Sequence, residues 1–189
     1  FTHLADTVRG ILATIDRLNE QGWTITRDEV LQAWSRARWP ARVEIVARRP
    51  WVVIDGAHNA ASAQALAQTL RACFPPGERT IVFGTTRDKD LAGQIQALAP
   101  IATRWIATRY LENPRAVPIA ELVQAIAQET GRPPRAEATP HDALAQARAV
   151  THPSGVVVVT GSLFLAAEAR SDVLGVENLT FPAVSAVGP

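Results

Sequence analysis

The stretch Trp51-Val-Val-Ile-Asp-Gly-Ala-His-Asn59, which continues as a regular apolar pattern to Leu70, decides the fold of this chain. Its opening residues are apolar and mostly β-branched, and they predict a buried strand. The apolar residues after Asn59 recur at helical spacing, so they predict a helix with Asn59 as its N-cap. The turn between them therefore carries a carboxylate, an imidazole and an amide at the carboxyl end of a strand. Open α/β sheets bind their ligands at that position.

Strands and helices alternate along the chain from about residue 43. Short β-branched runs followed by longer segments of helical periodicity are typical of a mostly parallel sheet with helices on both faces. We therefore expect an α/β fold with a Rossmann-like sheet. The predicted strands are 43–47, 51–54, 80–84, 102–107 and 156–160, and the predicted helices are 60–73, 90–98, 118–130, 140–150 and 163–170.

Two helices are predicted ahead of this sheet. Apolar residues share one helical face between residues 2 and 20, and Thr26-Arg-Asp-Glu29 is a capping box that opens a second helix. Proline disfavours a helix at the residue before it, so this second helix is expected to end before Trp39-Pro40. The expected division is residues 1–38, the helical end of a preceding domain with a linker; residues 39–170, the α/β domain; and residues 171–189, a loosely held tail.

The composition is that of an ordinary globular protein. The 189 residues are 47% hydrophobic and 20% charged, and the net charge of +1 disfavours nucleic acid or a membrane surface as a general partner. The single Cys73 excludes an internal disulfide and fits a reducing cytoplasm, and no apolar run is long enough to span a bilayer. No zinc-ligand spacing occurs, so we assign no metal ligand. The chain starts at Phe1 and contains no methionine, from which we expect a piece of a longer reading frame.

Arg42 is the first candidate for binding an anion. It lies in Arg38-Trp-Pro-Ala-Arg42-Val-Glu44, just before the first predicted strand. A guanidinium offers a planar fork of donors that suits phosphate oxygens. The alternative is a surface ion pair between Arg42 and Glu44, which would contribute little energy.

The turn after the second predicted strand supplies three candidates. Asp55 at the strand end can accept hydrogen bonds from ribose hydroxyls, and Asn59 can both donate and accept. His58 can contact phosphate or help to position a nucleophile. The alternative is a structural turn in which Asp55 and Asn59 accept hydrogen bonds from backbone amides.

Lys89, the only lysine of the chain, follows the third predicted strand in Arg87-Asp-Lys-Asp90. Its compact positive charge can bind a carboxylate or a phosphate. Asp88 and Asp90 are better explained as a helix N-cap and a first-turn acid, which the helix dipole favours.

Two more strand ends carry polar residues. Ser162, in Thr160-Gly-Ser162, can present a hydroxyl and backbone amides to an anion, and a plain N-cap serine explains it equally well. Arg115, in Glu112-Asn-Pro-Arg115, follows the fourth predicted strand and offers another guanidinium to the same edge.

Taken in order, these segments resemble the C-terminal domain of the Mur ligase superfamily and, within it, folylpolyglutamate synthase/dihydrofolate synthase. Two positions depart from that pattern: Ala60 stands where the family often has proline, and Ala41 where it often has glycine. The segments that carry the resemblance are Arg38-Trp-Pro-Ala-Arg42-Val-Glu44, Ile54-Asp-Gly-Ala-His-Asn59, Phe83-Gly84 with Asp88-Lys-Asp90, Pro114-Arg-Ala116 and Thr160-Gly-Ser-Leu163.

The resemblance implies a cytoplasmic, ATP-dependent acid–amino-acid ligase that uses Mg²⁺. In that family ATP phosphorylates a substrate carboxylate, the amine of L-glutamate attacks the acyl phosphate, and ADP and phosphate leave. Carried over by motif, Arg42 would contact the ATP phosphates, Asp55 the ribose and Asn59 the nucleoside. His58 and Lys89 would act in catalysis near the γ-phosphate. Lys89, Ser162 and, from its similarity to an Asp-Asn-Pro-Arg motif of related cell-wall ligases, Arg115 would bind the incoming glutamate.

No Gly-x-x-x-x-Gly-Lys-[Ser/Thr] sequence occurs in the chain. The resemblance implies that the phosphate-cradling loop, the Mg²⁺ ligands and the pocket for folate or dihydropteroate belong to an N-terminal ATPase domain that this domain contacts. The chain alone is therefore expected to show no ligase turnover. Two alternatives stay open: another Mur-type ligase that adds an amino acid to a cell-wall precursor, and a non-catalytic Rossmann-like module that binds a nucleotide or an amino acid.

Overall fold

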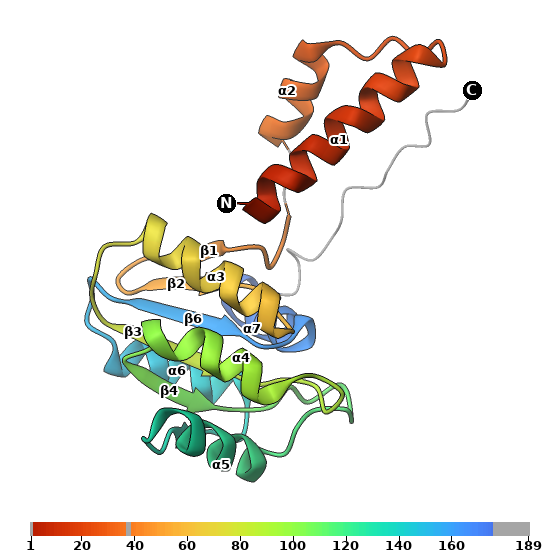
Figure 1. Ribbon diagram of the computed structural model, residues 1–189. Helices are drawn as coiled ribbons and strands as arrows, with labels where there is room; N and C mark the ends of the chain where they lie inside the picture. The colour runs from red at the N-terminus through yellow and green to blue at the C-terminus, as the bar shows by residue number, and fades with distance from the viewer. Residues whose placement is uncertain (1, 37–38, 176–189) are drawn as a thin grey trace.

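The computed structural model describes residues 2–36 and 39–175, with side chains from Val8 onward. Arg38 and the predicted tail beyond residue 175 lie outside the described residues. Two N-terminal helices, α1 (Thr2–Glu20) and α2 (Arg27–Arg36), precede a sheet that has helices on both faces (Figure 1). The strands are β1 (Glu44–Ala47), β2 (Trp51–Ile54), β3 (Arg79–Phe83), β4 (Arg104–Ala107), β5 (Arg135–Ala136) and β6 (Val156–Thr160), and the other helices are α3 (Ala60–Cys73), α4 (Leu91–Leu98), α5 (Ile119–Thr130), α6 (Pro140–Val150) and α7 (Leu163–Leu174).

The strand order in the sheet is β1-β2-β6-β3-β4-β5. All neighbours pair in parallel except β1, which runs antiparallel to β2. Glu44 is the register partner of Ile54, so the start of β1 lies at the carboxyl end of β2. The predicted α/β fold with a mostly parallel sheet is confirmed. The antiparallel edge strand adds its leading residues to the edge where the parallel strands end.

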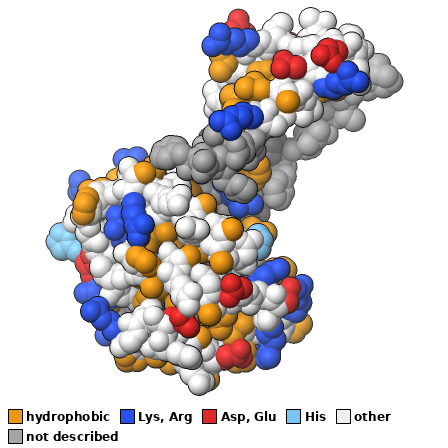
Figure 2. Space-filling model, viewed as in Figure 1, with side chains coloured by type: hydrophobic (Ala, Val, Ile, Leu, Met, Phe, Trp, Pro, Cys, Tyr) orange, Lys and Arg blue, Asp and Glu red, His pale blue; other side chains and the backbone are white. Residues whose placement is uncertain are grey.

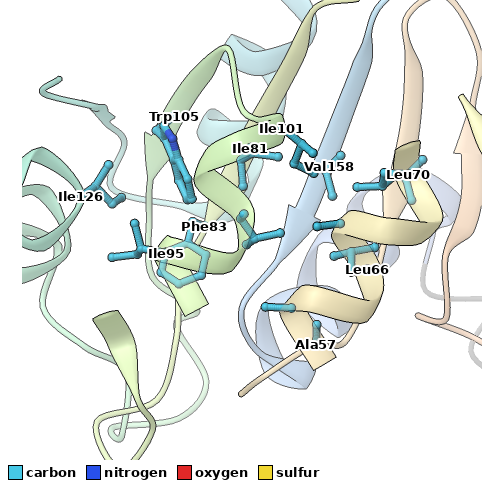
Figure 3. Packing of buried hydrophobic residues seen from close by; sticks show 14 of the residues in the cluster. Ala57, Leu66, Leu70, Ile81, Phe83, Ile95, Ile101, Trp105, Ile126 and Val158 are labelled. Carbon is cyan, nitrogen blue, oxygen red and sulfur yellow. The ribbon is translucent and has the colours of Figure 1, made fainter. Parts of the chain in front are cut away.

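The two faces of the sheet bury separate apolar clusters. Alternate strand residues point to opposite faces, so Val53, Ile81 and Val158 join α3, α4 and α5 on one side, where Leu66, Leu70 and Ile95 pack against them (Figure 3). The intervening strand residues pack against α6 and α7 on the other side. Central strands covered on both faces are near-continuous apolar runs, as the Val156–Val159 run of β6 is.

Three features differ from the predicted elements by more than one residue. Helix α7 continues to Leu174, so the first residues of the predicted tail are helical. Strand β4 begins at Arg104, not at residue 102, because a 3₁₀ turn that includes Pro100 occupies Ala99–Ile101. The exposed two-residue strand β5 was not predicted, because so short a segment has no periodicity to detect.

The N-terminal helices pack loosely. The predicted capping box is confirmed, since the Glu29 carboxylate accepts from the Thr26 backbone N–H at 2.8 Å and the Glu29 N–H donates to the Thr26 hydroxyl at 3.3 Å. Helix α2 contains no buried residue, and Leu12, Leu31 and Trp34 leave apolar surface exposed. Figure 2 shows these helices as a lobe with apolar side chains on its surface. None of the helices in the described ranges combines the length and apolarity that a membrane crossing requires.

Candidate functional site

The predicted site residues lie along one edge of the sheet, where the parallel strands end and the antiparallel strand β1 begins. Three of them follow β2, and each of the others lies at the end of another parallel strand or before the start of the antiparallel one. These five strands are consecutive neighbours in the sheet. A Cβ on Gly93 would lie 3.0 Å from Ala60 Cβ, so the start of α4 packs against the start of α3. In strand order the residues are Arg42 before β1; Asp55, His58 and Asn59 after β2; Ser162 after β6; Lys89 after β3; and Arg115 after β4.

Asp55 is the buried carboxylate of this edge, with only 6% of its surface exposed. One oxygen accepts from the Val43 backbone N–H at 2.9 Å and the other from the Ala57 N–H at 2.8 Å. Burial raises the pKa of Asp55 above its ordinary value, and the two backbone donors, Arg42 and His58 partly oppose this shift. Asp55 therefore accepts hydrogen bonds from backbone amides, as the alternative of a structural turn predicts. Its contact with a ribose stays a prediction.

Arg42 lies between two residues in the left-handed region: φ is 55° at Ala41 and 48° at Val43. The Gly56 N–H donates to the Ala41 carbonyl at 2.8 Å and ties this loop to the end of β2. The Arg42 guanidinium is exposed and lies 6.0 Å from the centre of the Trp39 ring. The alternative of an Arg42–Glu44 pair is wrong, because the Glu44 carboxylate pairs with Arg170 of α7 at 2.9 Å.

His58 and Asn59 begin α3. The His58 Nδ1 lies 2.9 Å from the Gly56 carbonyl, which can only accept, so Nδ1 carries the proton and Nε2 is the ring atom left for another contact. The Asn59 side-chain oxygen accepts from the Ser62 N–H at 2.8 Å, which confirms the predicted N-cap. The capping bond uses the amide oxygen and leaves the NH₂ group of Asn59 as a donor.

Lys89 and Arg115 share one partner, the carboxylate of Asp88. The Arg115 guanidinium lies 2.8 Å and the Lys89 ammonium 3.4 Å from Asp88, and all three side chains are partly exposed. Desolvation raises the pKa of Asp88, but hydrogen bonds from Arg115, from its own backbone N–H and from Lys89, together with the charge of Arg115, outweigh this effect and lower the pKa. Asp90, predicted as a first-turn acid, is instead the N-cap of α4, so the predicted cap at Asp88 is wrong.

Ser162 caps α7 and is almost fully buried. Its hydroxyl accepts from the Phe164 N–H at 3.1 Å, so the N-cap interpretation is confirmed. Gly161, before it, has φ 109°, and a Cβ there would lie 2.6 Å from the Gly84 carbonyl oxygen. Only glycine fits this close approach of the β6 and β3 ends. The Ser162 hydroxyl can still donate a hydrogen bond to a ligand.

Two supporting contacts of this edge had no sequence signal. The Glu168 carboxylate accepts from the Leu111 and Glu112 backbone N–H groups and fixes the loop that leads to Arg115. The buried Tyr110 hydroxyl lies 2.9 Å from the Thr86 hydroxyl, which joins the loops after β3 and β4. Both contacts join residues distant in sequence, so no local pattern predicts them.

The described residues bring together no group of three or more His, Cys, Asp or Glu side chains that could bind a metal ion. We therefore assign none of them as a metal ligand. A cavity of about 630 Å³ lies at the opposite edge of the sheet and includes Arg104, Trp105 and Glu129 in its wall. No predicted site residue lines this cavity.

A family model described as "Mur ligase, glutamate ligase domain" matches residues 41–163. Among curated proteins, the folylpolyglutamate synthase of Lacticaseibacillus casei is 33% identical over 160 residues, which cover 81% of this chain and 34% of that protein. The chain spans between a third and two fifths of the length of the first curated relatives it matches.

Two solved structures share the fold. The folylpolyglutamate synthase of Mycobacterium tuberculosis, complexed with ADP and AMPPCP, aligns with a TM-score of 0.71 and 31% identity over 79% of this chain and 36% of that one. The bifunctional folylpolyglutamate synthase/dihydrofolate synthase of Yersinia pestis, complexed with AMPPNP and a manganese ion, aligns with a TM-score of 0.66 and 26% identity over 79% and 35%.

Proposed function

The chain belongs to the family of the Mur ligase glutamate ligase domain, and on that premise we propose that it is the C-terminal domain of an ATP-dependent folylpolyglutamate synthase/dihydrofolate synthase. The proposed reaction joins L-glutamate to a carboxylate of folate or dihydropteroate. ATP phosphorylates that carboxylate, the glutamate amine displaces the phosphate, and ADP and phosphate are released.

The observation that carries this proposal is the row of polar and cationic groups on five neighbouring strand ends. Formation and aminolysis of an acyl phosphate place several negative charges close together. Fixed cations and hydrogen-bond donors stabilise such a transition state mainly by electrostatics and positioning. The open edge presents Arg42, Lys89 and Arg115 for that task.

For the nucleotide, we assign Arg42 to the phosphates, Asp55 to the ribose and Asn59 to the nucleoside. The exposed guanidinium of Arg42 stands on a loop with several backbone contacts, which favours a fixed position. Each Asp55 oxygen accepts one backbone hydrogen bond, and a carboxylate oxygen has capacity for a second from a ribose hydroxyl.

For glutamate, we assign Lys89, Arg115 and Ser162. Lys89 and Arg115 both contact the carboxylate of Asp88, so their spacing suits a carboxylate between them. We assign His58 and Lys89 to the reacting groups. The His58 Nδ1 contacts the Gly56 carbonyl, so Nε2 is the ring nitrogen available to a substrate.

A divalent cation belongs to this proposal, and we infer Mg²⁺ with ligands outside the described residues. We also propose that residues 1–38 belong to an adjoining ATPase domain, which the exposed apolar side chains of α1 and α2 support. The cytoplasmic location stays a prediction.

The test is phosphate release by the protein produced from the whole reading frame that encodes this chain. We expect release that requires ATP, L-glutamate and either dihydropteroate or a tetrahydrofolate, and we expect none from residues 1–189 alone. Arg42→Ala and Lys89→Ala are expected to lower kcat/KM by about 100-fold or more, while Arg104→Met, at the opposite edge, serves as the matched control. Release that depends on a cell-wall precursor, or nucleotide binding without turnover, would overturn the folate assignment.

A further inference from the structure

The loop that carries Arg42 has an unusual backbone. Ala41 and Val43 both have positive φ, and for a β-branched residue such as Val43 this conformation is a rare outlier. Residues in sparsely populated regions persist only where surrounding contacts enforce them, and they cluster at functional sites. The contacts that enforce this loop therefore bear on the position of Arg42.

Two carboxylates enforce the loop. Asp55 accepts from the Val43 N–H at 2.9 Å, and Glu44 accepts from the Ala41 N–H at 2.9 Å. The residues on either side of Arg42 are thus each bound to a carboxylate through the backbone. The Arg42 side chain is left to point outward while its backbone is fixed on both sides.

Glu44 is itself fixed by Arg170 of α7. The Arg170 Nε donates to both Glu44 oxygens, at 3.0 and 2.9 Å, and the side chains are only 13% and 21% exposed, respectively. Helix α7 begins directly after Ser162, at the end of β6. The ion pair therefore links the Arg42 loop to the helix that carries another predicted site residue at its start.

We infer that Glu44 and Arg170 are positioning residues for Arg42: the Arg170–Glu44 pair keeps the strained loop 41–43 in the conformation that presents the Arg42 guanidinium at the site. The effect on nucleotide binding rests on the proposed function, which assigns Arg42 to the nucleotide phosphates. The order of the loop itself does not depend on any ligand.

The first measurement is amide hydrogen exchange by NMR on the 189-residue chain without ligand. Arg170→Met is expected to speed exchange of the Ala41 and Val43 amides by about 10-fold or more relative to the central-strand amide of Val158. Arg104→Met is the matched control, because Arg104 also pairs with a glutamate, Glu78, and donates to a backbone carbonyl, but at the far edge of the sheet. Unchanged exchange at Ala41 and Val43 in Arg170→Met would overturn the inference. If Arg170→Met does not fold, Glu44→Gln replaces it, because glutamine keeps an acceptor for the Ala41 N–H without the charge.

The second measurement separates positioning from general stability, in the protein from the whole reading frame. Arg42→Ala and Arg170→Met are each expected to raise the KM for ATP by about 10- to 100-fold, since a small misplacement of a binding group has effects of that order. The double variant should be no worse than Arg42→Ala alone, and Arg170→Lys should recover part of the loss. Losses that multiply in the double variant would overturn the inference. A normal KM in Arg42→Ala would contradict the proposed role of Arg42, while the exchange experiment would still decide whether the pair orders the loop.

Discussion

The two cationic regions of the candidate site fix their side chains in opposite ways. Arg42 stands on a strained loop whose backbone is bound by two largely buried carboxylates, Asp55 and Glu44. Lys89 and Arg115 instead contact one exposed carboxylate, Asp88, through their charged ends. Contacts to buried backbone donors restrict position strongly, whereas exposed ion pairs contribute little and rearrange easily. We therefore regard the Arg42 region as preorganised and the Lys89–Arg115 region as adjustable.

The largest expected effect distinguishes Asp55, which binds the Arg42 loop, from Asp88, which contacts Lys89 and Arg115. Asp55→Ala removes the acceptor of the Val43 and Ala57 N–H groups and should lower the free energy of unfolding by about 2 kcal/mol, because buried donors are left unsatisfied. Asp88→Ala should leave the urea midpoint unchanged within error. Urea denaturation of both variants measures this difference, and equal midpoints for the two would remove the distinction.

The strain in the Arg42 loop can be measured directly. Ala41→Gly should raise the free energy of unfolding by about 0.5–1 kcal/mol, because glycine adopts positive φ without a Cβ clash. The matched control is Ala116→Gly, since Ala116 is equally exposed at 8% and lies outside the left-handed region. Thermal unfolding should show that this control variant is destabilised, because glycine adds backbone entropy to the unfolded chain. A destabilised Ala41→Gly would show that the loop carries no strain to relieve.

The adjustable region is tested by removing its internal carboxylate. Asp88→Asn should lower the KM for L-glutamate by about two- to fivefold, because Lys89 and Arg115 no longer contact a competing negative charge. Asp90→Asn is the control, since asparagine retains the N-cap of α4 and removes an equal charge from the same turn. If both variants behave alike, net charge and not the Asp88 contact sets the affinity.

The smallest effect is a pair of opposite titrations. The Asp55 carboxyl should titrate above its ordinary value of 3.8, because burial disfavours its charge, and the Asp88 carboxyl below 3.8, because two cations favour it. The part of the Asp55 contribution to stability that depends on pH is thus fully present below its unfolded pKa and is lost as pH rises through its folded pKa. The contribution of Asp88 is present above its unfolded pKa and lost as pH falls through its folded value. Carbon-13 shifts of the two carboxyls measure both, and a reversed order would contradict this account of their surroundings.

Local sequence patterns were sufficient for most of the fold. The apolar run of β2, the helical spacing after Asn59 and the capping box at Thr26 each depend on neighbours within a few residues, and each is confirmed. Asn59 was also identified as an N-cap from its position alone, and an N-cap was one of the two interpretations offered for Ser162. The roles assigned to the site residues in binding and catalysis remain predictions.

Contacts between distant residues could not be obtained in this way. The Glu44–Arg170 pair joins residues 126 positions apart, and the sequence suggested Arg42 as the partner of Glu44 because it is nearer. The contact of Asp88 with Arg115 was missed for the same reason, and Asp88 was interpreted as part of a helix start. Side-chain pairing across a sheet edge depends on strand order, which local periodicity does not contain.

The sequence by itself determined the succession of strands and helices, the turns that end the strands and the residue types found there, because periodicity, capping and turn chemistry act over a few residues. Only the tertiary structure decided that β1 runs antiparallel, and that its leading loop therefore lies beside the end of β2. It likewise decided that Asp55 and Glu44 bind the backbone on either side of Arg42. Those contacts form only after strand order and register bring distant segments together. The same packing imposes positive φ values on Ala41 and Val43, against the local preference of both residues.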